Sequence, residues 1–321
     1  MFVVFDTNTY RSLVNGLTGQ EALDRIAKIK EKEAAKGVRS LISSTVASEL
    51  ITHVLDGGRF EGEGDCTKAL RVMYDHCGDS KEYGIVPSPE VQLAKELFSK
   101  EDRTGIQTEK AIVEIVYQLY VSPSEETVET LRQNIESIAK HNEEVERMMA
   151  GFLVKLAKIW RTSESSEIEK MNQIRDIQSL ALISSIATKI NYEYQKSDNY
   201  FELYKIFETS LKLYQERYPV PLQMMVDFCK KLPNEKFIPD KPERVNQVWD
   251  QRILHVAGQS IQQQPIILVT NDQAMLESAK NSKAPVTSSN SDFTEPNTDP
   301  TSISNNVMAY SDYISWLGFT D

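Results

Sequence analysis

The sequence contains few of the residues from which disulfide frameworks and zinc sites are built. Three cysteines, Cys66, Cys77 and Cys229, and four histidines are present among 321 residues, with no CxxC or HExxH pattern. A disulfide framework, a zinc knuckle and histidine-based zinc chemistry are therefore not expected. The adjacent pair His76-Cys77 is typical of a surface loop. The sparse cysteines fit a reducing, cytoplasmic location.

Long hydrophobic runs are also missing. No apolar stretch approaches the ~20 residues that a membrane-spanning helix needs, and the N-terminus lacks the basic region of a signal peptide, so we expect no membrane partner. The net charge of −11 argues against a broad attraction to polyanions. Nucleic acid would therefore have to be bound through a local basic patch, a metal ion or a partner. Neither an RNP-like aromatic motif nor a glycine-rich phosphate loop is present.

Apolar runs alternate with helical patterns at both ends of the chain, which predicts an α/β fold with a parallel sheet. The expected strands are Val3–Phe5, 39–44, 266–270, 284–288 and 306–311. The expected helices are Gln20–Lys36, 45–54, 67–74, Val245–Gln262, Gln273–Asn281 and 312–319. The polar run Thr7-Asn8-Thr9 is interpreted as the end of the first strand, and 288–306 as a loop.

The middle of the chain has a different pattern, which is almost wholly helical from Glu109 to Leu232. After Ser122-Pro123, apolar residues follow a 3-4 spacing that predicts a helix of roughly 50 Å. Asn142 interrupts this apolar seam and is expected to set helix alignment. We predict that residues 106–239 form an all-helical subdomain, inserted into an α/β domain made of residues 1–105 and 240–321.

Four acidic residues occupy positions that this topology would bring together. Asp6 ends the first strand, Asp272 follows the strand 266–270, Glu49 lies on the helix after the second strand, and Asp250 lies on the helix Val245–Gln262. Ligands of open α/β sheets bind beside the carboxyl ends of the strands. Singly, each residue has an ordinary structural explanation as a helix cap, turn former or surface acid. Taken together, the four carboxylates would repel one another at close range, which predicts a bound cation that offsets the repulsion.

The chemistry of this set favours Mg²⁺ or Mn²⁺, because all of its ligands are oxygen atoms. Such an ion can lower the pKa of a bound water and neutralise charge on a phosphoryl oxygen. Thr270 is expected to orient a carboxylate or a bound water. Asn8 and Asn271 are placed as supporting residues of the two strand ends.

The segments FDTN, SSTVASELI, WDQRILHVAGQ and IILVTNDQAMLESA together resemble the PIN-domain nucleases. The resemblance covers roughly residues 1–105 and 240–321, and Asp6, Glu49, Asp250 and Asp272 match the acidic positions of that family. It implies a three-layer Rossmann-like sheet and metal-dependent endoribonuclease activity on RNA phosphodiesters. In that family the activity often belongs to the toxin of a toxin–antitoxin pair or to RNA processing. The helical block lies outside the resemblance.

Candidate substrate contacts are the basic residues nearest to the acidic set in sequence. Arg252 lies two residues from Asp250, and Lys241 and Arg244 precede it, so we predict that these three contact RNA phosphates. The helical block is predicted to bind a protein partner, such as an antitoxin, or to gate the substrate. A homo-oligomer is left open.

Two other interpretations are kept. A haloacid-dehalogenase-type phosphatase also begins with an apolar strand that leads into DxDxT, but here the second acidic position is Asn8, and Glu49 and Asp250 would have no role. A non-catalytic α/β scaffold that binds RNA or protein through its helical block is the other alternative. It is favoured by the low basic charge and disfavoured by the complete carboxylate set.

Overall fold

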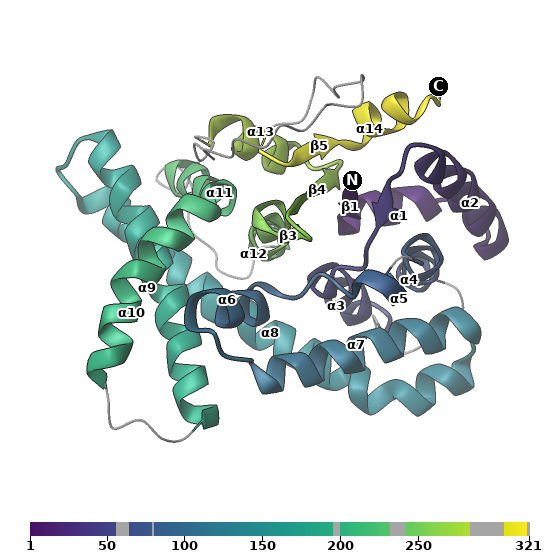
Figure 1. Cartoon of the computed structure of the whole chain (residues 1–321), viewed down its shortest axis with the longest axis horizontal. Coiled ribbons are helices and arrows are strands. Elements are labelled where there is room, and N and C mark those ends of the chain that lie inside the picture. Colours follow the sequence, from purple (N-terminus) through teal and green to yellow (C-terminus); the bar gives the residue numbers. More distant parts are fainter. Residues whose placement is uncertain (56–63, 79, 195–199, 232–241, 283–304, 320–321) are drawn as a thin grey trace.

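The computed structural model describes residues 1–55, 64–78, 80–194, 200–231, 242–282 and 305–319. The chain folds as an α/β protein with a small parallel sheet and many helices (Figure 1). The strands are β1 (Phe2–Phe5), β2 (Arg39–Ser40), β3 (Ser260–Ile261), β4 (Gln264–Thr270) and β5 (Val307–Ala309).

The helices before the middle of the chain are α1 (Thr7–Val14), α2 (Gly19–Ala35), α3 (Ser44–Thr52), α4 (Asp65–His76), α5 (Ser80–Tyr83), α6 (Pro89–Phe98) and α7 (Arg103–Val121). Those that follow are α8 (Glu125–Thr162), α9 (Glu167–Tyr194), α10 (Tyr200–Arg217), α11 (Pro219–Lys231), α12 (Pro242–Ile253), the 3₁₀ helix η3 (Leu254–Gly258), α13 (Gln273–Asn281) and α14 (Tyr310–Leu317). No described helix combines the length and apolarity needed to span a membrane.

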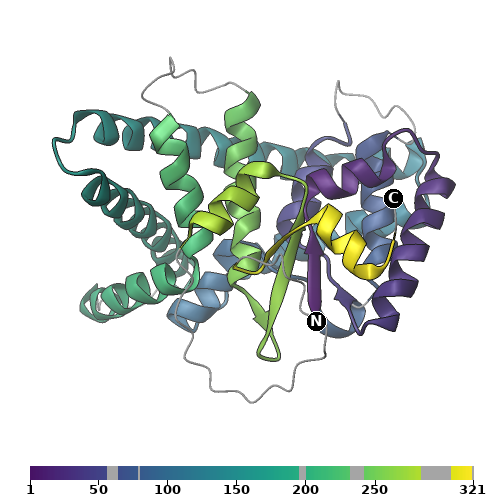
Figure 2. The ribbon, with the colours of Figure 1, turned by 90° about the horizontal axis from the view of Figure 1, so that it is seen from above.

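The sheet is built around β1 and β4, which are far apart in sequence and adjacent in space. They pair in parallel with Phe5 opposite Val269, β2 pairs in parallel with β1, and β5 pairs in parallel with β4. All four residues of β1 are buried, as its continuous apolar sequence predicts. Figure 2 shows β1 and β4 lying side by side in the middle of the molecule. The predicted parallel sheet is therefore confirmed.

The second strand and the helix before β4 differ from the prediction. β2 covers only Arg39–Ser40, because Ser43 already precedes the first turn of α3. The helix predicted over Val245–Gln262 ends at Ile253 and is followed by η3 and β3, which joins β4 through Gln262 and Gln263. Both glutamines have positive φ angles of 50° and 66°, as in a tight hairpin turn. The predicted strand 284–288 lies outside the described residues.

Gly258 explains why the chain can change direction after η3. A Cβ atom at this position would lie 2.4 Å from Cδ1 of Tyr218 and 2.8 Å from the Arg217 carbonyl oxygen. Only glycine therefore allows the chain to pass so close to α10 before it enters β3.

The helix α1 is absent from the sequence prediction, which placed a polar turn at Thr7-Asn8-Thr9. Asp6 caps this helix, because its Oδ1 accepts a hydrogen bond of 2.7 Å from the Thr9 amide. Tyr10, Leu13 and Val14 then fall on one buried face. The turn-like residues are thus a helix start, which is the other common use of Asp and Thr. The helix α6 also lies in a region for which no element is predicted.

A buried polar network joins the helices on one side of the sheet. Glu33 on α2 accepts hydrogen bonds from His76 Nε2 at 3.0 Å, Ser40 Oγ at 2.8 Å and Tyr313 Oη at 2.5 Å, and His76 Nδ1 lies 3.0 Å from Tyr10 Oη. Burial alone would lower the pKa of His76, but the Glu33 carboxylate overcomes this and raises it to about 10. The pair His76-Cys77 is therefore buried, and its interpretation as a surface loop is wrong.

The long helix α8 connects the sheet region with the outer helices. It contacts α3, α7 and α12, and also α9 and α11 (Figures 1 and 2). Its side chain Asn142 donates to Thr52 Oγ1 at 2.6 Å and to the Ser48 carbonyl at 3.2 Å, both on α3. The prediction that Asn142 aligns helices is confirmed.

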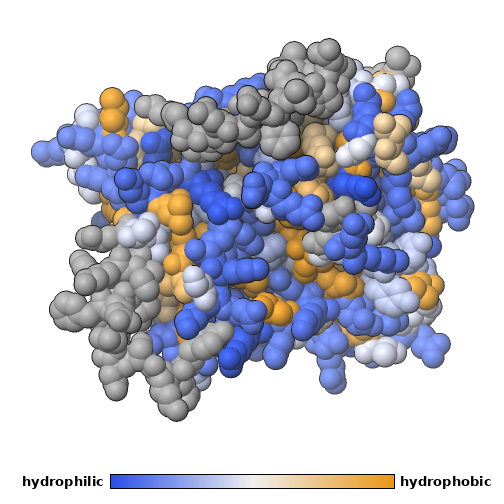
Figure 3. Space-filling model, in the orientation of Figure 1, coloured by the Kyte–Doolittle hydropathy of each residue, from blue (hydrophilic) through white to orange (hydrophobic). Residues whose placement is uncertain are grey.

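Parts of the predicted helical insertion belong to the same hydrophobic core as the sheet. Ile112 and Leu119 of α7, and Val128 and Ile135 of α8, are buried in one cluster with β1 and β4. The predicted boundary at residue 106 falls within α7. The division into two domains stays a prediction. The face seen in Figure 3 is mostly hydrophilic, with scattered hydrophobic side chains.

Candidate metal centre

Asp6 and Asp272 lie at the carboxyl ends of the two central parallel strands, as predicted. Thr270 connects them: its hydroxyl donates to Asp6 Oδ2 at 2.5 Å and accepts from the Asp272 amide at 2.8 Å. The Asp6 amide in turn donates to the Val269 carbonyl at 3.0 Å, which continues the strand pairing to the site. Asp6 and Thr270 are fully buried. The arrangement fixes the two carboxylates against one sheet edge.

Both aspartates also cap the helices that follow them. Asp6 Oδ1 caps α1 through Thr9, and Asp272 Oδ1 accepts a hydrogen bond of 2.9 Å from the Met275 amide at the start of α13. The capping role that each residue could have alone is therefore real. It uses one carboxylate oxygen of each residue, and no described donor binds Asp272 Oδ2.

Glu49 and Asp250 come from two helices that approach the same edge. Glu49 on α3 accepts a hydrogen bond from the Thr7 hydroxyl, one residue beyond Asp6. Asp250 on α12 is 7% exposed, and no described residue donates a hydrogen bond to its carboxylate. Contact between α12 and α3 brings the two helices together. A buried acid without a partner is unfavourable unless a ligand or a proton compensates for it.

The pKa values show that the four carboxylates share one electrostatic environment. Burial first, and then the charges of Asp272, Glu49 and Asp6, raise the pKa of Asp250 to about 9. Burial also raises the pKa of Glu49 to about 7, with Asp6 adding to the effect although the bond from Thr7 opposes it. For Asp6 the pKa rises to about 6, again mainly through burial, against the bonds from Thr270 and Thr9.

No positive side chain neutralises this set within the described part of the chain. Arg11 lowers the pKa of Glu49 but forms no ion pair with it, and the described residues form no ion pair with Asp6, Asp250 or Asp272. Among the described residues, the hydrogen-bond partners of the set are neutral groups, namely the side chains of Thr7, Thr9 and Thr270 and backbone amides. Clustered acids with raised pKa values are typical of functional sites.

The residue types of the set fit a hard divalent ion, but its four acidic side chains are spaced too widely to surround one. All available donors are oxygen atoms, which suits Mg²⁺ or Mn²⁺. Across the described residues, no group of three or more His, Cys, Asp or Glu side chains lies close enough together to hold a metal ion in this arrangement. A bound ion would therefore have to draw the carboxylates together, from a starting point in which Asp6 and Glu49 are held by threonines.

In the described structure, the predicted supporting residues Asn8 and Asn271 form no hydrogen bond with the carboxylates of the set, and their supporting role stays a prediction. Asn8 is exposed on α1. Asn271 is exposed and donates to Ser12 Oγ at 3.1 Å, which ties the end of β4 to α1. Thr270 has the supporting position that the sequence predicts for it.

Of the three predicted phosphate contacts, Arg252 forms an ion pair within the protein. Arg252 forms a two-pronged ion pair with Glu90 on α6, with Nη2 2.9 Å from Oε2, and lines a cavity between helices. Lys241 lies outside the described residues. Arg244 lies in the first turn of α12. The assignment of these three residues to RNA binding stays a prediction.

Two residues near the set were missed from the sequence. Thr7 bonds to Glu49, and its position directly after Asp6 was the available signal. Glu146 on α8 adds a charge that raises the pKa of Glu49 and accepts a hydrogen bond of 2.6 Å from Trp249 Nε1. Nothing distinguishes Glu146 in sequence from the other glutamates of α8.

Comparisons of this chain with models of protein families, with curated proteins and with solved structures found no match.

Proposed function

We propose that this protein is a metal-dependent endoribonuclease with a three-layer, PIN-like α/β fold. The observation that carries the proposal is Asp250. It is buried and lacks a described hydrogen-bond partner, and burial together with the charges of Asp272, Glu49 and Asp6 raises its pKa to about 9. The mutual charge effects among these four acids, which come from distant segments of the chain, support a bound cation here.

The residues of the chain would divide the work of holding Mg²⁺ or Mn²⁺. Asp6, Glu49, Asp250 and Asp272 supply the oxygen ligands, and the hydroxyls of Thr7 and Thr270 fix two of these carboxylates. When bound, the ion lowers the pKa of a coordinated water and neutralises charge on a phosphoryl oxygen. The ion would thereby allow a phosphodiester to approach a site that is otherwise negative. Such compensation is needed because the net charge of −11 repels RNA.

A cleavage assay with single-stranded RNA tests this function. RNA labelled at one end is incubated with the protein in Mn²⁺, in Mg²⁺ or in EDTA. Asp6→Asn removes one ligand charge and keeps the oxygen that caps α1, so the variant is expected to fold. We expect internal cleavage with the wild type in either metal, none in EDTA, and a loss of at least ~100-fold with Asp6→Asn.

Glu31→Gln is the control, because Glu31 is an exposed acid near the end of α2, and α2 leads into the start of β2 at the edge of the sheet opposite to Asp6 and Asp272. It should cleave like the wild type. RNA that stays intact in every condition while still binding the protein would favour the non-catalytic scaffold. Cleavage that persists in EDTA, or in a folded Asp6→Asn variant, would reject this site as the catalytic centre.

A further inference from the structure

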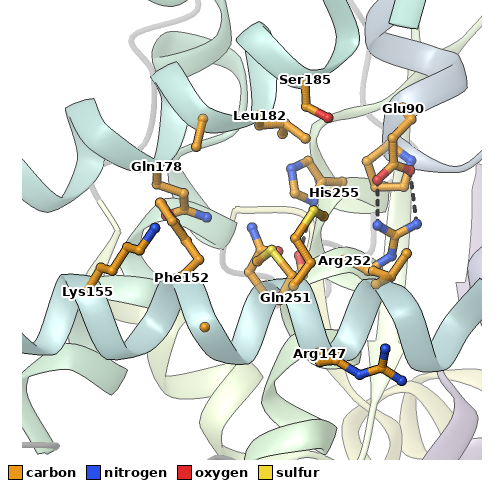
Figure 4. A pocket seen from close by; sticks show the side chains of 16 residues that line it. Glu90, Arg147, Phe152, Lys155, Gln178, Leu182, Ser185, Gln251, Arg252 and His255 are labelled. Atoms are coloured by element: carbon orange, nitrogen blue, oxygen red, sulfur yellow. Dashed lines mark hydrogen bonds and ion pairs between the residues drawn. The ribbon is translucent and has the colours of Figure 1, made fainter. Parts of the chain in front are cut away.

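A second site lies on another side of α12, away from the acidic set. A cavity of about 440 Å³ opens between α6, α8, α9 and η3 (Figure 4). This volume lies in the range of pockets that bind small organic molecules. The cavity wall is mainly apolar, with side chains that include Met149, Phe152 and Leu182.

Gln178 is the unusual polar residue of this wall. It is 3% exposed, and neither Nε2 nor Oε1 of its amide has a hydrogen-bond partner among the described residues. An amide buried without partners is costly, and such groups in folded proteins are nearly always satisfied. Its two free atoms present one donor and one acceptor side by side. A ligand that satisfies both must carry an adjacent acceptor and donor.

The other residues that line the cavity indicate which further groups a ligand should carry. Phe152 and Lys155 line the same cavity as Gln178, and Figure 4 shows that Arg147 points away from the other side chains. Arg147 is exposed and lies 3.6 Å from Glu143. Phe152 offers a flat surface for stacking, and Lys155 offers a positive charge at the cavity edge.

The deeper end of the cavity carries little net charge. Glu90 and Arg252 neutralise each other, and Arg252 Nε is a further buried donor without a partner in the described structure. Burial lowers the pKa of His255 to about 4, so its ring is neutral near pH 7. Both ring nitrogens are engaged, with Tyr214 Oη at 2.9 Å and the Gln251 carbonyl at 3.0 Å. The cavity therefore suits a neutral ring system, and among its described lining residues Lys155 offers a positive charge for an acidic group.

We propose that this cavity binds the nucleobase of a nucleotide. Each of the common bases has an adjacent donor and acceptor on one edge, which the amide of a glutamine can pair with in two bonds. The base would stack on Phe152, as bases stack on aromatic side chains in other proteins, and the phosphate would lie near Lys155. The base can belong to a free mononucleotide or to a strand of RNA.

The position of the cavity links it to the acidic set without making it part of that set. Gln251 and Arg252, which line it, follow Asp250 directly on α12. A ligand in the cavity would contact the helix that carries Asp250 and would therefore be placed to influence the set. Base binding itself requires neither metal nor cleavage, so it stands independently of the proposed nuclease activity.

Isothermal titration calorimetry with the full-length protein in EDTA tests the proposal. The ligands are AMP, GMP, CMP and UMP, with ribose 5-phosphate as the control that has no base. A hexauridylate oligonucleotide, which EDTA protects from metal-dependent cleavage, distinguishes a base in RNA from a free nucleotide. We expect at least one base-containing ligand to bind with a Kd below about 1 mM and ribose 5-phosphate not to bind.

Gln178→Leu is the decisive variant, because leucine keeps the volume of the side chain and removes both hydrogen-bonding atoms. It should weaken base binding at least ten-fold and raise the Tm of the free protein, since an unsatisfied buried amide is removed. A merely structural role of Gln178 would instead lower the Tm. The matched control Gln133→Leu alters an exposed glutamine of α8 and should bind like the wild type.

Three results would overturn the proposal. These are the absence of binding by all four nucleotides and the oligonucleotide, equal binding of ribose 5-phosphate, and unchanged affinity of Gln178→Leu. Binding of the oligonucleotide alone would support base recognition and assign it to RNA. Binding of mononucleotides would assign it to a free ligand.

Discussion

The pair formed by Glu33 and His76 should make a large contribution to stability that depends on pH in a defined direction. The perturbation is Glu33→Gln, which keeps the shape of the side chain and removes its charge. His76 would then be buried at 2% exposure without its counterion, and Ser40 and Tyr313 would lose a charged acceptor. Removal of one partner from a buried ion pair typically destabilises a protein by about 3–5 kcal/mol.

The pKa of His76 gives a second value for this effect. It rises from 6.5 to about 10 in the folded protein, a difference of roughly 3.5 pKa units. At about 1.4 kcal/mol per unit this corresponds to ~5 kcal/mol, which is an upper bound for a tightly coupled pair. We therefore expect Glu33→Gln to lower the free energy of unfolding by about 3 kcal/mol near pH 6.

The sign of the pH dependence follows from the two shifts. A raised pKa of His76 means that its contribution is complete below about pH 6.5 and is lost as the pH rises through about 10. Burial works to raise the pKa of Glu33, but the charge of His76 prevails and lowers it, so that this contribution is lost as the pH falls below about 4.5. The difference between wild type and variant should be largest between about pH 4.5 and 6.5.

Urea unfolding followed by far-UV circular dichroism at about pH 5.5, 7.5 and 9.5 measures this difference. Glu31→Gln, an exposed glutamate two residues away on the same helix, is the control and should change stability by less than about 0.5 kcal/mol. A loss below about 1 kcal/mol at pH 5.5, or a loss that grows towards pH 9.5, would refute the charge-pair reasoning.

Two further predictions concern the acidic set. In EDTA near pH 7, Asp250→Asn should raise the Tm by an amount that corresponds to about 2 kcal/mol. Burial, and then the charges of Asp272, Glu49 and Asp6, raise the pKa of Asp250 to about 9, so folding must keep a proton on this acid, and the amide removes that cost. Mn²⁺ should raise the Tm of the wild type but barely that of the variant, and differential scanning fluorimetry that shows equal Mn²⁺ shifts would place the ion elsewhere. Thr270→Val should lower the free energy of unfolding by about 1–3 kcal/mol and reduce RNA cleavage, since Asp6 and the Asp272 amide both lose a hydrogen-bond partner. An unchanged cleavage rate in a folded variant would show that Thr270 is not needed to orient Asp6.

The parts of the fold that depend on local patterns could be predicted from sequence. The apolar runs of β1 and β4 are long enough to identify buried parallel strands, and the residues that follow them, Asp6 and Asp272, fall at one sheet edge. Because this inference needs only strand direction and strand ends, it succeeded without knowledge of packing. Thr270 could be placed at this edge for the same reason, because it is the last residue of β4.

The parts that depend on long-range packing could not be predicted. Arg252 is expected at an RNA phosphate because it lies close to Asp250 in sequence, and this assignment stays a prediction. Its ion pair with Glu90, which is 162 residues away, could not be predicted. One helical turn contains residues that face opposite sides, so closeness in sequence does not by itself establish a shared site. In sequence, Gln178 likewise resembles any other helical glutamine. Only the packing of α9 with α8 and η3 around the cavity shows that its amide is buried.

Local ambiguity explains the remaining differences. Thr7-Asn8-Thr9 is compatible with both a turn and a helix start, and only the bond from Thr9 to Asp6 decides between them. The change of direction at the end of η3 depends on the close approach of Gly258 to Tyr218, a contact that no periodic pattern reveals.

The bonds from Asn142 to α3 bear on how this protein can be shortened. Ser48, which Asn142 holds, is the immediate neighbour of Glu49, so a helix outside the α/β part supports the segment that carries a proposed metal ligand. Removal of residues 106–239 would leave these polar groups without their partner and would strip Ile112, Val128 and Ile135 from the core. Both losses predict that a chain reduced to residues 1–105 and 240–321 would be less stable than the whole protein, and that a shortened form would fold better with α8 retained.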